Sequence, residues 1–247
     1  MDLIKEIEKK IKDEDIFKIV FYGASTTVVA YSFPNWAEII KYALRERFEE
    51  IIGDWKAPYW FIQSFNGGLD GASSRDLLMN LERFAIKENP DLVFLSASKN
   101  DAYYNFKPGE TEKNTKQITE KLLKNGVKII FTTSIPSYDE KRNDKIKIFA
   151  EKDRKIASEY KDNSNFLFVD FFKLIENKYL GKMYTLIQES NEEIIDSKRG
   201  DIDTIHFNKY GNAVVASVLL KECFGIDFDV DQFIKDIKDD TRKNPRF

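Results

Sequence analysis

The chain of 247 residues is long enough to build one large domain around its own hydrophobic core. Hydrophobic residues make up 42% of it and charged residues 33%, which is the balance of a folded globular protein rather than of a disordered chain. The net charge of −3 argues against nucleic acid as a partner, because phosphate binding draws on clustered positive charge.

Cysteine content and hydropathy indicate the cellular compartment of the protein. Cys223 is the only cysteine, so the chain forms no internal disulfide and carries no mark of an oxidising environment. The first residues lack the uninterrupted apolar stretch of a signal peptide, and no segment approaches the ~20 apolar residues of a membrane span. We therefore expect a cytoplasmic protein without a membrane span, with an exported parent protein and the oligomeric state left open.

Five short runs of apolar, β-branched and aromatic residues recur along the chain. They are "IFKIVFY" (16–22), "YWFIQSF" (59–65), "DLVFLSA" (91–97), "VKIIFTT" (127–133) and "NFLFVDFF" (165–172). Most do not alternate cleanly between apolar and polar residues, which is typical of strands buried on both faces.

Segments with helical spacing separate these runs, at residues 35–52, 73–89, 111–126 and 139–160. Ser73 or Ser74 can cap the second of them, and Gly126 can end the third. Strand and helix therefore alternate, which predicts parallel strands with right-handed crossovers and helices on both faces of the sheet. The fold class is α/β: a three-layer α/β/α sandwich around a five-stranded parallel sheet.

The chain reads as one domain over residues 1–247, because no repeat, low-complexity tract or Pro/Gly/Ser-rich linker interrupts it. The stretch at about 173–201 has mixed helical character and is interpreted as an insertion or lid. Residues 206–224 and 227–240 should supply the last two helices.

Polar residues follow the predicted strands. The loops after parallel strands share one edge of an open sheet, where ligands bind. The blocks that fall there are "GAS" (23–25), "NGGLDG" (66–71), "SKND" (98–101) and "DTIHFN" (203–208).

These four blocks hold every group that acyl transfer through a serine requires. Ser25 would be the nucleophile, and its N–H would be one oxyanion donor. His206, the only histidine, would be the base, and Asp203 would fix the tautomer of that ring. The Gly68 N–H and the Asn100 side-chain amide would complete the oxyanion hole.

In order and spacing the blocks resemble those of the SGNH or GDSL hydrolases. "GAS" is similar to the family's G-D-S, "NGGLDG" to N-x-G-x-x-G, "SKND" to G-x-N-D, and "DTIH" to D-x-x-H. The run "HFNKYGNAVVA" is similar to the family's H-P-N-x-x-G-x-x-x-x-A. The resemblance spans nearly the whole chain and implies a flavodoxin-like sandwich and a serine esterase.

Two residues depart from the family pattern. Ala24 stands where G-D-S has aspartate, which removes a carboxylate that could hold nearby loops. Ser98 stands where G-x-N-D has glycine, and it is expected to add a side chain close to the oxyanion region. Neither position is one of the four residues whose chemistry the mechanism uses.

No cofactor is expected. With one histidine and one cysteine, metal ligands would have to be carboxylates, and the sequence shows no dense Asp/Glu cluster. The "NGGLDG" loop lacks the spacing of a nucleotide-binding loop.

Aromatic residues near the same edge suggest the substrate. Tyr31, Tyr103, Tyr104 and Phe207 are expected to line a cleft, because flat aromatic faces suit sugar rings. Since no apolar lid is evident, we expect a small-molecule or glycan ester with a small acyl group, such as O-acetyl on a carbohydrate. Two alternatives stay open: an O-acyltransferase that uses the same residues, and a catalytically inactive glycan-binding module.

Overall fold

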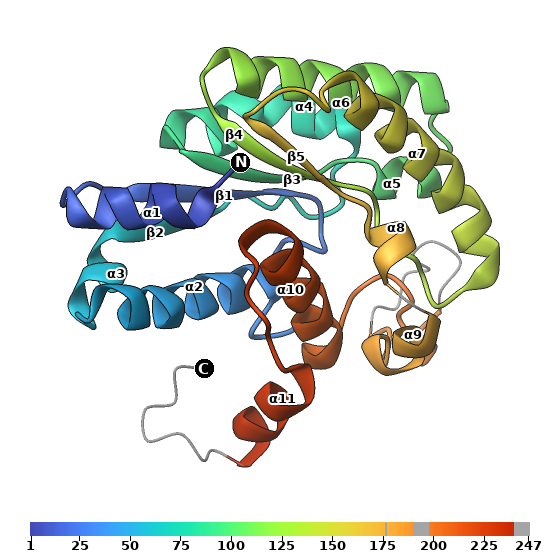
Figure 1. Ribbon diagram of the computed structural model, residues 1–247. Coiled ribbons are helices and arrows are strands. Elements are labelled where there is room, and N and C mark those ends of the chain that lie inside the picture. Colours follow the sequence, from blue (N-terminus) through green and yellow to red (C-terminus); the bar gives the residue numbers. More distant parts are fainter. Residues whose placement is uncertain (176, 190–197, 240–247) are drawn as a thin grey trace.

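The computed structural model of the protein describes residues 1–175, 177–189 and 198–239. The strands form one parallel sheet in the order β2-β1-β3-β4-β5 (Figure 1). They are β1 (Phe17–Gly23), β2 (Ile62–Asn66), β3 (Leu92–Ser96), β4 (Lys128–Thr132) and β5 (Phe166–Val169). This is the flavodoxin-like order, in which the chain winds outwards from β1 in both directions. The prediction of a five-stranded parallel sheet is confirmed.

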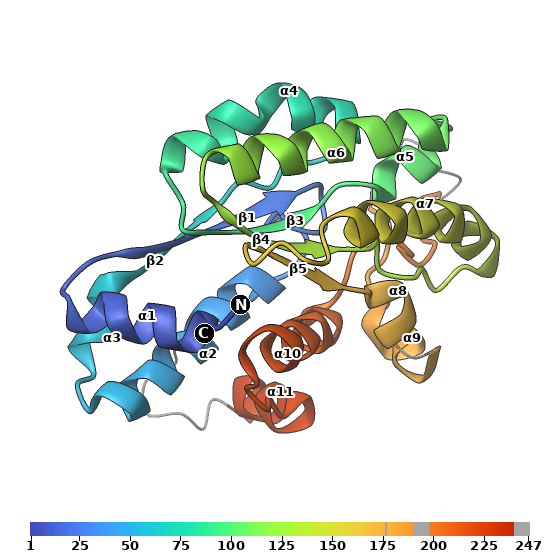
Figure 2. The same ribbon diagram turned by 45° about the horizontal axis from the view of Figure 1, so that its top comes forward.

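Helices cover both faces of this sheet (Figures 1 and 2). One face carries α1 (Leu3–Lys12), α2 (Trp36–Ile52) and α10 (Lys209–Phe224), and the other carries α4 (Ser74–Phe84), α6 (Pro108–Lys124) and α7 (Glu140–Glu159). The remaining helices are α3 (Lys56–Phe61), η1 (Ile86–Glu88), α5 (Lys99–Tyr103), α8 (Phe171–Leu174), α9 (Asn177–Met183) and α11 (Val230–Asp239). The two layers of helices complete a three-layer sandwich.

Alternation along β1 shows why the strands are apolar throughout. Ile19 and Phe21 pack into the cluster under α1, α2 and α10, whereas Val20 and Tyr22 pack into the cluster under α4 and α6. Because successive side chains point to opposite faces, a strand covered on both sides must be apolar at every position.

Two strand boundaries, the start of β2 and the end of β5, differ by three residues from those that the sequence predicts. Residues 59–61 belong to α3 rather than to β2, and Pro58 lies in the first turn of that helix, where a missing N–H costs nothing. Strand β5 ends at Val169, because the Asp170 carboxylate caps α8 by accepting from the Lys173 N–H. Apolar composition alone reveals neither the effect of Pro58 on α3 nor the cap of α8.

The predicted insertion at 173–201 contains the end of α8, the helix α9 and one flank of an isolated antiparallel bridge between Ile187 and Ile202. Residues 176 and 190–197 of that stretch lie outside the described residues. Among the helices that the structure describes, none is both long enough and apolar enough to cross a membrane.

The register of β1 and β3 positions the candidate site. Gly23, the last residue of β1, lies opposite Ser96, the last residue of β3. The chain therefore leaves the sheet at the same level on two adjacent strands, which brings Ser25 and the "SKND" block to one edge.

Candidate active site

Ser25 lies in a tight turn directly after β1. The Thr27 N–H donates to the Ala24 carbonyl at 2.9 Å, and the Val28 N–H donates to the Ser25 carbonyl at 3.1 Å. Asn35 and Asn66 then donate from their side-chain amides to the Thr27 carbonyl, at 2.7 and 2.8 Å. The turn is thereby tied both to the start of α2 and to the end of β2. Only 5% of Ser25 is exposed.

His206 and Asp203 form a hydrogen-bonded pair. The ring Nδ1 lies 2.7 Å from Asp203 Oδ2, and Asp203 Oδ1 accepts from the N–H groups of Ile205 and His206, at 2.8 and 3.0 Å. Burial raises the pKa of Asp203, but these hydrogen bonds outweigh it and leave that pKa below its ordinary value. An ionised Asp203 therefore fixes the orientation of the imidazole, as a catalytic base requires.

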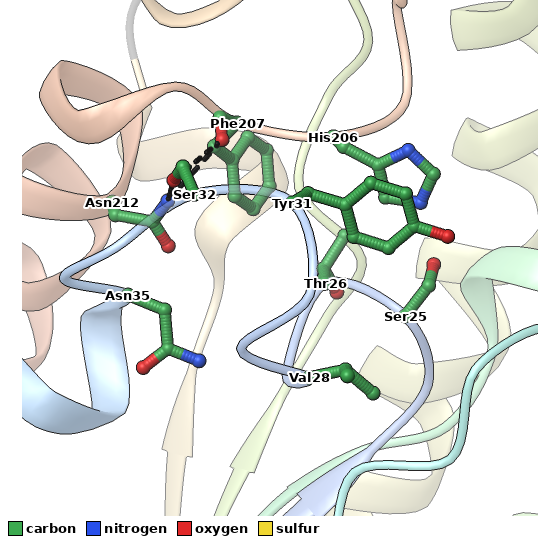
Figure 3. Close-up of a pocket in the computed structure, with 9 residues that line it drawn as sticks. All are labelled: Ser25, Thr26, Val28, Tyr31, Ser32, Asn35, His206, Phe207 and Asn212. Atoms are coloured by element: carbon green, nitrogen blue, oxygen red, sulfur yellow. Dashed lines mark hydrogen bonds between the residues drawn. The ribbon is translucent and has the colours of Figure 1, made fainter. Parts of the chain in front are cut away.

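The other ring nitrogen faces no protein partner. His206 Nε2 is buried and makes no hydrogen bond to any of the described residues. The side chains of Ser25, Tyr31 and His206 gather at one end of a small cavity, with Asn35 and Asn212 at its other end (Figure 3). In ligand-free sites, the hydrogen bond between nucleophile and base is often loose, and it shortens when substrate is bound.

Tyr31 covers one face of the imidazole. Its ring is stacked on His206 with centroids 3.5 Å apart and planes within 5° of each other. The phenol donates to the Asp70 carboxylate, whose oxygens lie at 2.9 and 3.0 Å, and burial together with Asp70 raises the pKa of Tyr31. Asp70 could not be predicted as a site residue, since an acidic residue in a glycine-rich loop is typical of an ordinary turn.

A larger pocket opens beside the stacked Tyr31 and His206 rings. It is lined by Ser25, Tyr31, Asp70, Gly71, Asn100, Tyr104, Ile205 and His206. All four blocks that the sequence analysis brought to the sheet edge thus contribute to one opening.

Asn100 lines this pocket, and a hydrogen bond to the backbone holds its side chain in place. Its Nδ2 donates to the Ala72 carbonyl at 2.9 Å, which uses one of the two amide hydrogens. The following residue, Asp101, accepts from the Ser74 N–H at 2.7 Å and from the Ser74 and Thr111 hydroxyls, both at 2.5 Å. Asp101 therefore joins α5 to the starts of α4 and α6.

The structure does not place Gly68 at the pocket. The Gly68 N–H donates to Asn66 Oδ1 at 3.0 Å, and a Cβ there would lie 2.9 Å from the Val28 nitrogen. Gly68 is therefore required for the close approach of the 27–28 backbone rather than for holding substrate. Gly71 lines the pocket instead, at a φ of +67°, and its N–H donates to none of the described residues.

Ser98 also differs from expectation. Its hydroxyl lies 2.9 Å from that of Ser134 and donates to Asp153 Oδ2 at 2.6 Å, inside the protein. The side chain is buried and does not line the pocket, so its effect is on the packing of α7 and not on the oxyanion region.

Two of the four expected substrate-binding aromatics are core residues. Tyr103 is buried against Ile146 and Phe149, and Phe207 is 2% exposed within the cluster under α10. Phe207 reaches only the small cavity of Figure 3, whereas Tyr31 and Tyr104 line the larger pocket. Spacing placed all four near the edge but could not tell which way each ring turns.

The described residues contain no group of three or more His, Cys, Asp or Glu side chains that could hold a metal ion.

A parallel α/β sandwich with a serine, a histidine–aspartate pair and an asparagine at its carboxyl edge belongs to the serine hydrolase class. The family model described as GDSL-like Lipase/Acylhydrolase matches residues 19–219. The chain belongs to this family of carboxylic ester hydrolases, and the expected membership is confirmed. Among curated proteins, none matches the sequence.

Solved structures share the fold at low sequence identity. The chain is similar to the lipase/acylhydrolase from Enterococcus faecalis, with 19% identity and a TM-score of 0.59, over 85% of this chain and 96% of that one. It is similar to the acetyl xylan esterase AlAXEase, with 19% identity and a TM-score of 0.60, over 84% and 100%. It is also similar to Axe2, an acetylxylan esterase from Geobacillus stearothermophilus, with 18% identity and a TM-score of 0.64, over 86% and 96%.

Proposed function

We propose that this esterase hydrolyses small acyl esters of a carbohydrate through an acyl-enzyme on Ser25. The observation that carries the proposal is the hydrogen-bonded Asp203–His206 pair beside Ser25. His206 Nδ1 lies 2.7 Å from Asp203 Oδ2, and His206 Nε2 has no partner among the described residues. An imidazole held in this way can take a proton only at Nε2, on the ring edge away from Asp203.

The reaction proceeds in two halves. His206 Nε2 removes the Ser25 hydroxyl proton as Oγ attacks the ester carbonyl, and the tetrahedral intermediate collapses as the protonated imidazole delivers that proton to the departing alcohol. Water then attacks the acyl-enzyme, losing its proton to the same nitrogen, and the acid leaves as Ser25 regains its proton.

Three donors are available for the oxyanion. They are the N–H of Ser25, the N–H of Gly71 in place of Gly68, and the second amide hydrogen of Asn100. Such donors act on charge that develops in the transition state, so each contributes to kcat more than to substrate binding.

The choice of a small acyl group on a sugar rests on the two openings beside Ser25. The larger one carries hydrogen-bonding groups from Asp70, Tyr31 and Tyr104, which suit hydroxyl-rich alcohols. The smaller one is too narrow for a long acyl chain. Two of the structural neighbours are named acetylxylan esterases, which supports the same substrate class.

Acetyl release from acetylated xylo-oligosaccharides tests this proposal, beside p-nitrophenyl esters with acyl chains of increasing length. We expect turnover that is fastest for acetyl and that falls by at least about 10⁴-fold in both Ser25→Ala and His206→Ala. Circular dichroism should show that both variants are folded. Turnover near the wild-type rate in either variant would remove that residue from the mechanism, and a preference for long acyl chains would overturn the substrate class.

A further inference from the structure

Lys99 is a buried charged residue that the reaction does not use. It is the first residue of α5, next to Asn100, and only 6% of it is exposed. A lysine is almost never buried to this extent without a partner, because water stabilises the ammonium strongly. Its contacts therefore indicate what it does.

Those contacts lie on both sides of His206. The ammonium donates to the carbonyl of Ile205 at 3.0 Å, which is the peptide group directly before His206. It also lies 5.0 Å from the ring centre of Phe207, directly after His206, and 6.0 Å from that of Tyr184. The Lys99 side chain, next to Asn100, thus contacts both residues that flank His206 in the sequence.

Lys99 also interacts electrostatically with Asp203, the partner of His206. Burial lowers the pKa of Lys99 to about 7, with the Asp203 carboxylate opposing that shift and the Arg142 guanidinium adding to it. Tyr184 faces it as a neutral phenol, since burial raises the pKa of Tyr184 and its hydroxyl donates to the Pro136 carbonyl. Lys99 is therefore a cation in mildly acidic solution and lies within electrostatic reach of Asp203.

We propose that Lys99 is a positioning residue for His206, which fixes the 205–207 turn against α5 and opposes protonation of the imidazole. This inference deepens the proposed esterase mechanism and rests on His206 being its base.

The two parts of this role have different physical origins. The hydrogen bond to the Ile205 carbonyl sets where the imidazole lies relative to Ser25 and Asn100, and a displacement of about 1 Å in such a group can cost on the order of 100-fold in rate. The positive charge acts at a distance, because a second cation nearby disfavours the imidazolium. A neutral imidazole is the form that can accept the proton of Ser25.

His206 is the only histidine in the chain, so its titration can be followed by NMR without ambiguity in untagged protein. The variants are Lys99→Met, which removes both charge and hydrogen bond, and Lys99→Gln, which keeps a neutral donor. Lys113→Met, at an exposed position of α6, is the matched control for loss of one positive charge. Replacing a buried ion by an apolar group of similar length commonly preserves the fold, which a thermal melt checks.

We expect the His206 titration midpoint to move to higher pH, by about half to one unit, in both Lys99 variants and not in Lys113→Met. The acid limb of kcat/KM should move with it. We also expect kcat at its optimum pH to fall by roughly ten- to a hundredfold in Lys99→Met, and to recover in part in Lys99→Gln.

An unchanged midpoint in folded Lys99→Met would overturn the electrostatic role, and an unchanged kcat would overturn the positioning role. Because the NMR titration needs no turnover, it separates failure of this inference from failure of the esterase proposal. If the wild-type protein hydrolyses no ester, the titration still decides whether Lys99 opposes protonation of His206.

Discussion

Asn100 shows how one side chain can be both anchored and available. One amide hydrogen is donated to the Ala72 carbonyl, and the other is left for a ligand in the pocket. Its neighbour Asp101 makes three hydrogen bonds to α4 and α6, so the donor is held before substrate arrives. Such preorganisation is what makes an oxyanion donor effective.

Asn100→Ala is therefore expected to lower kcat by on the order of 100-fold or more, with a much smaller change in KM. Steady-state kinetics on p-nitrophenyl acetate measure both parameters. Asn80→Ala, at a half-buried asparagine of α4 that does not line the pocket, is the control for loss of an amide. A decrease of only a few fold in kcat would exclude Asn100 from the oxyanion hole.

The four sequence blocks predicted which residues meet, and they were less informative about what each residue does. Ser25, Asn100, Asp203 and His206 follow from chemistry and spacing, because parallel strands bring their following loops together. Gly68 was predicted as an oxyanion donor because sequence does not show which N–H of a glycine-rich turn an adjacent asparagine occupies. Lys99 was overlooked because a lysine between two polar residues reads as exposed.

At the scale of elements, the turn after β1 and the turn before α10 form one unit. Ser32 donates to the Phe207 carbonyl at 3.1 Å, and Asn212 of α10 donates to the Ser32 hydroxyl at 2.8 Å. The Tyr31 ring stacks on His206 next to these bonds (Figure 3). The relative position of nucleophile and base therefore depends on α10 as well as on the two loops.

Helix α7 is joined to the "SKND" loop through a buried carboxyl. Asp153 accepts from the Ser98 hydroxyl at 2.6 Å, and burial raises the pKa of Asp153 to about 8. Its ordinary value, near 3.8, applies in the unfolded chain. The folded protein thus binds this proton more tightly than the unfolded chain does. The stability that Asp153 contributes is complete below about pH 4 and is lost as the pH rises towards about 8.

Asp153→Asn should remove this pH dependence, because the amide stays neutral at every pH and can still accept from Ser98. The free energy of unfolding in urea, measured at about pH 5 and about pH 8, should fall more steeply in the wild type than in the variant. Asp162→Asn, at an exposed position, should follow the wild type. Equal slopes in the wild type and in Asp153→Asn would show that Asp153 is already ionised in the folded protein.

For the whole molecule, the order of the sheet decides where chemistry is possible. The chain reverses direction of winding between β1 and β3, and Ser25 and Asn100 follow these two strands (Figure 1). The parallel strands and the helices on both faces could be predicted from the alternation of apolar runs and helical segments, and the flavodoxin-like arrangement from the family resemblance of the four blocks. The short helices α3 and α8 could not, since caps and a proline determine their limits within runs that look like strands.

The central claim is that Ser25 is a nucleophile activated by His206, and covalent labelling tests it most directly. The purified protein is treated with a fluorophosphonate probe, beside Ser25→Ala and His206→Ala, and intact mass is recorded over time. We predict one adduct on the wild type, none on Ser25→Ala, and labelling that is slower by orders of magnitude on His206→Ala. No adduct on folded wild-type protein, or an adduct that persists in Ser25→Ala, would contradict the account.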